Sequence, residues 1–145
     1  MILSKKQGYT LAIVILLLDQ LSKLIAINNN TYITNTGSAW GLFQGSRFLL
    51  LVISFIAIFY INRYFSSHPL GLSLLLGGVL GNLCDRLFRG HVIDFIDIKL
   101  FNYPLFNIAD IAIVIAIVLI IFKKEGKEVF IESLSWIFHF PPKVK

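Results

Sequence analysis

Four apolar segments of this chain approach the roughly 20 residues that a helix needs to cross a bilayer. They run over Tyr9–Ile27, Arg47–Arg63, Pro69–Phe88 and Phe106–Phe122. Because lipid offers no partner to unpaired backbone N–H and C=O groups, each segment is expected to be helical. The chain is 57% hydrophobic and 14% charged, which is typical of membrane proteins. The sequence therefore predicts an all-α membrane protein with four transmembrane helices in one bundle.

The first apolar segment has basic residues before it, as a removable signal peptide would. Lys5 and Lys6 precede it. However, Tyr9–Ile27 is too long for the apolar region of a signal peptide, and it contains Asp19 and Lys23. No small-x-small cleavage site follows. We therefore expect this segment to be retained as a membrane span that also acts as a signal-anchor.

The distribution of Lys and Arg predicts the orientation of the bundle. With the N-terminus inside, the inner side holds Lys5, Lys6, Arg63, Lys123, Lys124, Lys127, Lys143 and Lys145, and the outer side holds Lys23, Arg47, Arg86, Arg89 and Lys99. This bias predicts that both termini are cytoplasmic and that Asn28–Ser46 and Arg89–Leu105 lie outside. Because the positive residues gather beside apolar segments, the net charge of +5 indicates contact with membrane lipid and not with nucleic acid.

Both outer connections contain patterns typical of short strands. Thr31–Thr34 is expected to form one, with a turn at Asn35–Gly37, and His91–Lys99 is a candidate for another. Trp40 and Phe43 suit the water–lipid interface, where aromatic rings anchor a chain. A small extracytoplasmic sheet is therefore compatible with the helical bundle.

The C-terminal tail, residues 125–145, differs in kind from residues 1–124. Its apolar residues recur at helical spacing, with polar residues largely between them: Phe130, Ile131, Leu134, Ile137 and Phe138. The pattern fits an amphipathic interfacial helix on the cytoplasmic surface, stopped by Pro141 and Pro142. An ordinary flanking helix without a function of its own is the favoured interpretation.

The stretch from Gly81 to Asp110 concentrates acids and amides beside apolar runs, and it holds four of the eight acidic residues. Such groups are costly at the edge of a membrane span unless they are paired or reach water, and they usually serve a function. Asp94 and Asp110 are the candidates for catalysis, because two carboxylates that meet across a water form an acid–base pair. Asp97 is the rival for the position of Asp94. The helix dipole alone would account for an isolated Asp110, but not for the pair.

Several residues are candidates for supporting these two acids. Asn82, Asp85 and Arg86 lie at i, i+3 and i+4, so they share one face of a helix. Asn107 lies one turn before Asp110. Asp85 and Arg86 are able to neutralise each other or other charges, and together with Asn82 they are also able to orient a catalytic carboxylate. Support of the site is favoured over a direct part in the chemistry.

Two further motifs lie nearer the N-terminus. Asp19 and Lys23 are four residues apart with the acid first, which predicts a neutralising pair that ties the first helix to its neighbours. Asn35 and Gly37 belong to N-T-G-S-A-W-G. That string is either an ordinary glycine-rich turn or a backbone shaped for close approach of an extended substrate.

Thiol and metal chemistry are not favoured by the sequence. Cys84 and His91 resemble a nucleophile and its base, but a lone Cys is more often a packing residue. No H-E-x-x-H motif and no Cys/His cluster occur, so neither a metal nor a cofactor is expected. The one cysteine excludes an internal disulfide.

Five strings occur in this order: D-Q-L-S-K (19–23), N-T-G-S-A-W-G (35–41), G-N-L-C-D-R (81–86), V-I-D-F (92–95) and F-N-I-A-D (106–110). Together they resemble the sequence blocks of the lipoprotein signal peptidases, the type II (prolipoprotein) signal peptidases of bacteria. The resemblance covers about Tyr9 to Phe122. The tail after Lys124 matches no block of that family.

This resemblance implies an aspartic endopeptidase of the inner membrane, with a small β-cradle over a site near the extracytoplasmic face. Its substrates would be diacylglyceryl-modified prolipoproteins, cut just before the lipidated cysteine. By resemblance, Asp94 and Asp110 correspond to the catalytic pair. The site-lining positions are Asn35, Gly37, Asn82, Arg86 and Asn107, and the supporting positions are Asp19, Lys23 and Asp85. We expect a monomer.

Two other functions remain open from the residues alone. A small proton- or ion-coupled transporter would also use acids and amides within the membrane. The absence of an internal repeat and the gathering of polar groups at one membrane face weigh against it. A non-catalytic assembly factor would need no acid pair, so it would keep working after replacement of Asp94.

Overall fold

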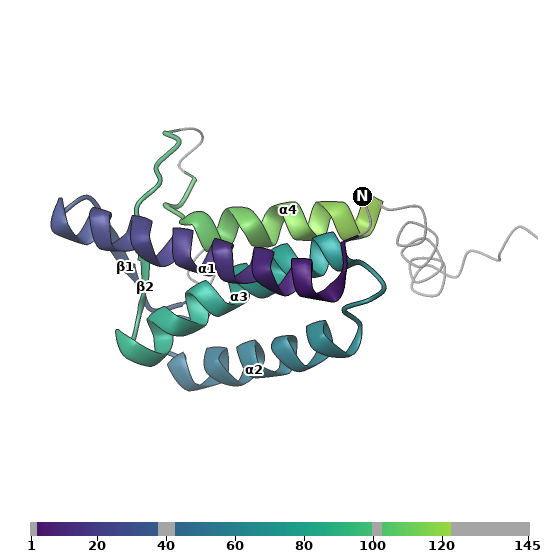
Figure 1. Cartoon of the computed structure of the whole chain (residues 1–145). Helices are drawn as coiled ribbons and strands as arrows, with labels where there is room; N and C mark the ends of the chain where they lie inside the picture. Colours follow the sequence, from purple (N-terminus) through teal and green to yellow (C-terminus); the bar gives the residue numbers. More distant parts are fainter. Residues whose placement is uncertain (1–2, 38–42, 100–102, 123–145) are drawn as a thin grey trace, which may run out of the picture.

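The computed structural model describes residues 3–37, 43–99 and 103–122. These residues form four helices and two short strands, drawn in Figure 1. In chain order they are α1 (Lys5–Asn28), β1 (Ile33–Asn35), α2 (Arg47–Arg63), α3 (Pro69–Phe88), β2 (Val92–Asp94) and α4 (Ile108–Phe122). By length and composition, α1 and α3 are able to cross a membrane. The helical fold with a small sheet agrees with the prediction. The count of four spans stays a prediction, because α2 and α4 have 17 and 15 residues.

Local features of the sequence explain where α1 and α3 begin. α1 begins at Lys5, earlier than predicted, because Ser4 and Gln7 form a capping box in which each side chain accepts the backbone N–H of the other. α2 ends at Arg63, and α3 begins with Pro69 in its first turn, where a missing N–H costs nothing. The tight connection predicted between these two helices is therefore confirmed.

The two strands pair in antiparallel register, with Ile33 opposite Asp94. β2 falls within the predicted stretch His91–Lys99. β1 begins later than predicted, because the N–H of Thr31 still donates to the C=O of Ala26 at the end of α1, at 3.0 Å. The pairing fixes the last residue of β2 at one end of the bundle, away from the N-terminus (Figure 1).

The start of α4 also differs from the prediction. The helix begins at Ile108 and not at Phe106. Phe106 instead exchanges backbone hydrogen bonds with Ile96, at 2.8 and 3.1 Å, in an isolated antiparallel bridge. This bridge ties the segment after β2 to the segment before α4, so both segments lie at the same end of the bundle.

α3 lies at the centre of the fold and contacts each of the other three helices. Near its C-terminal end the close approach requires a glycine. A Cβ atom at Gly81 would lie 2.6 Å from a carboxylate oxygen of Asp19 on α1 and 3.1 Å from the Cβ of Ala109 on α4. Away from these polar groups the core is apolar and includes Phe65 and Leu76. Helix packing is therefore tight both around the polar groups and away from them.

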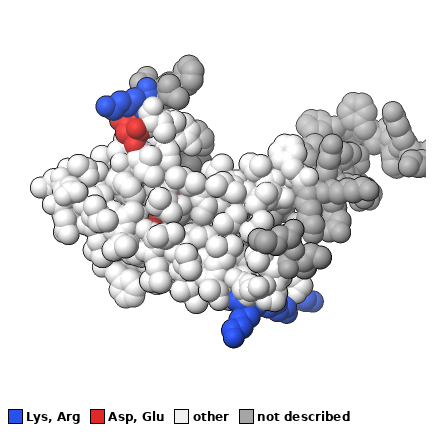
Figure 2. All heavy atoms as spheres, turned by 45° about the horizontal axis from the view of Figure 1, so that its top comes forward, with Lys and Arg blue, Asp and Glu red and all other residues white. Residues whose placement is uncertain are grey.

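The surface and the interior are reversed in polarity relative to a soluble helical bundle. On α1, Leu17, Leu18 and Leu21 are 61%, 55% and 58% exposed, whereas Asp19 and Lys23 are completely buried. On the face in Figure 2, the charged side chains lie at two opposite ends and the surface between them is almost entirely uncharged. An apolar belt between polar ends suits a bilayer, as the composition predicts.

Candidate active site

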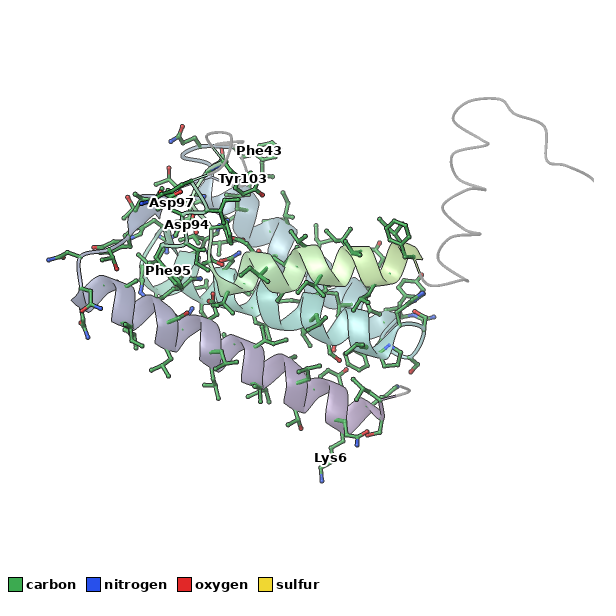
Figure 3. The ribbon with its side chains drawn as sticks, turned by 90° about the horizontal axis from the view of Figure 1, so that it is seen from above. Lys6, Phe43, Asp94, Phe95, Asp97 and Tyr103 are labelled. Atoms are coloured by element: carbon green, nitrogen blue, oxygen red, sulfur yellow. The ribbon has the colours of Figure 1, made fainter. Side chains whose placement is uncertain are left out.

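Asp94 and Asp110 line the same cavity, which has a volume of about 780 Å³. Asp94 is the last residue of β2 and is only 2% exposed, and Asp110 lies in the first turn of α4. The cavity wall is formed by residues of β1, α2, α3, β2, the segment 103–106 and α4. In Figure 3, Asp94 lies beside Tyr103, at the end of the bundle opposite Lys6. The fold therefore brings together the two acids that the sequence singled out.

Asn107 contacts both carboxylates. Its Nδ2 donates to Oδ1 of Asp94 at 2.6 Å, and its backbone N–H donates to Oδ2 of Asp110 at 3.2 Å. The backbone N–H of Asp110 in turn donates to Oδ1 of Asn107 at 3.0 Å. Asn82 completes the arrangement, because its Nδ2 donates to Oδ1 of Asp110 at 2.9 Å and its Oδ1 accepts from Asn107 at 3.2 Å. Two neutral amides thus hold two carboxylates in one place.

The turn after β1 lies against the same acids. Nδ2 of Asn35 donates to Oδ2 of Asp94 at 3.0 Å, while Oδ1 of Asn35 accepts the N–H of Gly37 at 2.9 Å. The C=O of Gly37 accepts from the guanidinium of Arg86 at 3.0 Å. Arg86 also lines the cavity with the two acids. A cation from α3 therefore faces the acid pair and hydrogen-bonds to the turn after β1.

Burial is the main influence on Asp94, which lies outside the helices. It raises the pKa of Asp94 above its usual range, since burial removes water from the charged form. Hydrogen bonds from Asn35 and Asn107 oppose this effect, and the negative charge of Asp110 adds to it. A carboxyl group with a raised pKa next to a second carboxylate is suited to hold a proton and to release it, which an acid–base mechanism requires.

A second polar cluster lies behind the cavity and is closed to solvent. Nζ of Lys23 lies 2.7 Å from Asp19 and 2.8 Å from Asp85, and all three side chains are 0% exposed. The predicted pair of Asp19 and Lys23 is therefore present. Asp85 also forms an ion pair with Arg89. Burial of Lys23, Asp19 and Asp85 is tolerable here because the two anions meet Lys23 and the partly exposed Arg89 at hydrogen-bonding distance.

Sequence reasoning missed three contributors to this region. Nε2 of Gln20 donates to Asp19 and to Asp85, at 3.2 and 3.1 Å, and its place inside D-Q-L-S-K was the available signal. Arg89 lies four residues after Asp85, a spacing that predicts an ion pair. Arg47 donates to two backbone C=O groups at the end of α3, which depends on the tertiary fold and left no local signal.

Other residues considered from the sequence lie apart from the cavity. Asp97, the rival of Asp94, is exposed, and its carboxylate accepts the backbone N–H of Lys99 at 2.8 Å. Neither Cys84 nor His91 is among the described residues that line the cavity. The interfacial Trp40 and the tail 125–145 lie outside the described residues.

Comparison with known families identifies the relatives of this chain. Residues 11–124 match the family model of signal peptidase (SPase) II. The chain belongs to the signal peptidase II family. Members of this family are peptidases of the bacterial inner membrane that process prolipoproteins, and this chain has lipoprotein signal peptidase function.

Two solved structures resemble this family member. One is described as a bacterial membrane enzyme solved by the in meso method at 2.3 Å resolution. It is 26% identical, with a TM-score of 0.73, and the match covers 95% of this chain and 94% of the other. A second bacterial membrane enzyme, solved by the same method at 1.9 Å, is 29% identical with a TM-score of 0.70, over 79% of this chain and 89% of that one. The fold of the described residues thus resembles that of two bacterial membrane enzymes.

Proposed function

We propose that the peptidase activity is of the aspartic type, with Asp94 and Asp110 as the catalytic pair. The observation that carries the proposal is that one residue, Asn107, hydrogen-bonds to both carboxylates at the wall of one cavity. Two carboxylates held this closely cannot both ionise easily, so they share one proton over a range of pH. Arg86 faces them and balances the single negative charge that remains.

The pair performs hydrolysis by exchanging protons with water and the peptide. The ionised carboxylate takes a proton from a water molecule, which attacks the scissile carbonyl carbon. The protonated carboxyl donates its proton to the carbonyl oxygen, and a gem-diol forms. The carboxyl that is now protonated then donates its proton to the nitrogen of the leaving peptide, the other carboxylate takes a proton from a hydroxyl of the gem-diol, and the C–N bond breaks as the new carboxyl group forms. Both carboxyl groups then return to the state with one shared proton.

The other polar residues support this reaction. Asn82 and Asn107 orient Asp110 and Asp94 through neutral hydrogen bonds, which do not fix either acid in its ionised form. The first outer segment, with Asn35 and Gly37, lies where the main chain of an extended substrate would pass the acids.

The apolar part of the cavity suits the lipidated part of a prolipoprotein. Its wall between α2 and α4 consists mainly of aliphatic side chains, including Leu50, Ile53, Ile113, Val114 and Ile117. We propose that the signal segment or the diacylglyceryl chains lie against this wall, which brings the bond before the lipidated cysteine to the two acids. Holding the lipid in this way orients the scissile bond, and orientation of this kind contributes several kcal/mol to catalysis.

We propose that all four helices span the membrane, that both termini are cytoplasmic and that the acids lie near the extracytoplasmic face. Lys5, Lys6 and Arg63 belong to the end of the bundle opposite Asp94, which fits an excess of positive charge on the cytoplasmic side. A single chain supplies every residue of the proposed site, so a monomer is sufficient for activity.

The purified protein, reconstituted with a diacylglyceryl-modified precursor, is the test. We expect a shortened product whose new N-terminus is the lipidated cysteine. The matched control is the same precursor without its lipid, for which we expect little or no product. Equal cleavage of the two precursors would contradict the proposed role of the lipid, and cleavage of neither would contradict the proposed substrate.

A further inference from the structure

The buried acids behind the cavity reach both catalytic segments through the backbone. Oδ1 of Asp19 accepts the N–H of Ala109 at 2.9 Å, and Oδ2 of Asp85 accepts the N–H of Ile93 at 3.1 Å. Each of these two backbone donors belongs to the residue immediately before one of the proposed catalytic aspartates. The two catalytic segments, which come from different parts of the chain, are therefore held by one pair of buried carboxylates.

Lys23 connects these two carboxylates to each other. Its Nζ lies 2.7 Å from Oδ2 of Asp19 and 2.8 Å from Oδ2 of Asp85. The third N–H of the ammonium group donates to Oδ1 of Asn82 at 3.2 Å. This last contact orients the Asn82 amide so that its Nδ2 faces Asp110, to which it donates at 2.9 Å. All three donors of Lys23 are thus used in a side chain that is 0% exposed.

We propose that Lys23 is a positioning residue that sets the spacing of the two catalytic carboxylates. The proposal rests on the proposed aspartic mechanism, and it gives Lys23 a role beyond neutralising the charge of Asp19. A neutralising pair would need only Asp19 and Lys23. Here the ammonium group joins Asp19 and Asp85, each of which holds the backbone before one catalytic residue. A displacement of about 1 Å at either acid would disturb the shared proton and lower the rate about 100-fold.

Lys23 also belongs to the set of charged groups that face the catalytic pair. α1 contributes Asp19 and Lys23, and α3 contributes Asp85 and Arg86. The described wall of α2 contributes only uncharged side chains to the cavity. If the two catalytic carboxylates move apart, their coupling weakens, and their two apparent pKa values approach each other. Loss of Lys23 should therefore narrow the bell-shaped dependence of the rate on pH.

The test compares Lys23→Met with wild type in the reconstituted cleavage assay. We expect kcat to fall about 100-fold with KM changed less than about threefold, because misplacement of the acids impairs the chemical step and leaves substrate contacts intact. We also expect a narrower pH–rate profile. Phe65→Ala serves as the matched control, since it opens a cavity in the apolar core at the inner end of the bundle. Phe65→Ala should lower the thermal midpoint of unfolding without narrowing the pH–rate profile.

If Lys23→Met does not accumulate, Lys23→Arg tests whether the spacing of the two carboxylates matters when the positive charge is kept. It keeps the positive charge, but the longer, planar guanidinium cannot join both carboxylates at the same spacing. We expect a stable protein with a reduced kcat and a narrowed profile. Wild-type kcat and profile in either Lys23 variant would overturn the proposal, provided that Asp94→Asn is inactive in the same assay. If Asp94→Asn were itself active, the catalytic pair would be wrong instead.

Discussion

Two pairs of acids lie next to each other at one end of the bundle, and their partners differ. Asp19 and Asp85 are completely buried and form ion pairs with Lys23 and Arg89. Asp94 and Asp110 line a cavity, and every side-chain hydrogen bond that the described residues make to them comes from an asparagine amide. One pair is sealed and matched in charge, while the other is accessible and held by neutral groups.

This difference suits the two pairs of acids to different roles. A carboxylate that lies 2.7 Å from a buried ammonium group has its negative charge matched by that group, so the pair is suited to hold two parts of the fold together. An amide donor binds a carboxylate without adding charge, and burial then favours the protonated form, as at Asp94. The partners of a buried acid therefore indicate its role better than its depth does.

The comparison predicts its largest effect at the cavity pair. Asp94→Asn and Asp110→Asn should each lower cleavage of lipidated precursor by about 100- to 10,000-fold, the range expected for loss of a general acid or base. Both variants should still accumulate in the membrane. Asp97→Asn is the matched control, because Asp97 is exposed and contacts only a local backbone N–H among the described residues. Near wild-type cleavage by either cavity variant would refute the aspartic mechanism.

A smaller but substantial effect is expected from the amide that touches both acids. Asn107→Ala removes the donors to Asp94 and to Asn82 and should lower kcat by about 100-fold, since the acids lose their common support. Asn62→Ala is a suitable control, because Asn62 is a polar residue of α2 at the other end of the bundle, where its Oδ1 accepts a hydrogen bond from the hydroxyl of Tyr9. An Asn107 variant as active as the Asn62 variant would show that the amide has no part in catalysis.

Stability should respond in opposite directions at the two pairs. The pKa of Asp94 is raised in the folded state, so its contribution to stability is fully present below the unfolded pKa and is lost as pH rises through the folded pKa. At neutral pH, Asp94→Asn should therefore raise the thermal midpoint by about 2–4 °C, and Asp85→Leu, which removes one of the two carboxylates that balance the buried Lys23, should lower it. The gain from Asp94→Asn should vanish in acid. An unchanged midpoint at neutral pH would contradict this account of Asp94.

The smallest effect is expected at the cysteine. Cys84→Ala should keep activity within about twofold of wild type, because a lone half-buried cysteine acts as a small packing residue. Thiol alkylation and metal chelators should likewise leave cleavage unchanged. Loss of cleavage by a normally folded Cys84→Ala protein would favour a thiol mechanism over the aspartic one.

Much of the fold was predictable because its signals are local. Hydropathy over 17 to 20 residues identified the helices, and the spacing of Asp19 and Lys23 predicted their ion pair. The starts of α1 and α4 were less predictable. A capping box at Ser4 lengthened α1, and a backbone bridge between Ile96 and Phe106 shortened α4. The capping box could have been read from the sequence, whereas the bridge joins segments that meet only in the folded chain.

The sequence by itself determined the class of protein, the family blocks and the two acids that lie at the cavity. Without the family blocks, the residues alone could not determine which acids would be sealed and which would reach the cavity, because Asp85 and Asp94 both follow an apolar residue and look alike locally. Only the tertiary structure decided that Asp85 faces Lys23 while Asp94 faces Asn107. The physical reason is that these partners come from α1 and from the start of α4, and long-range packing through Gly81 is what brings those elements to the same point.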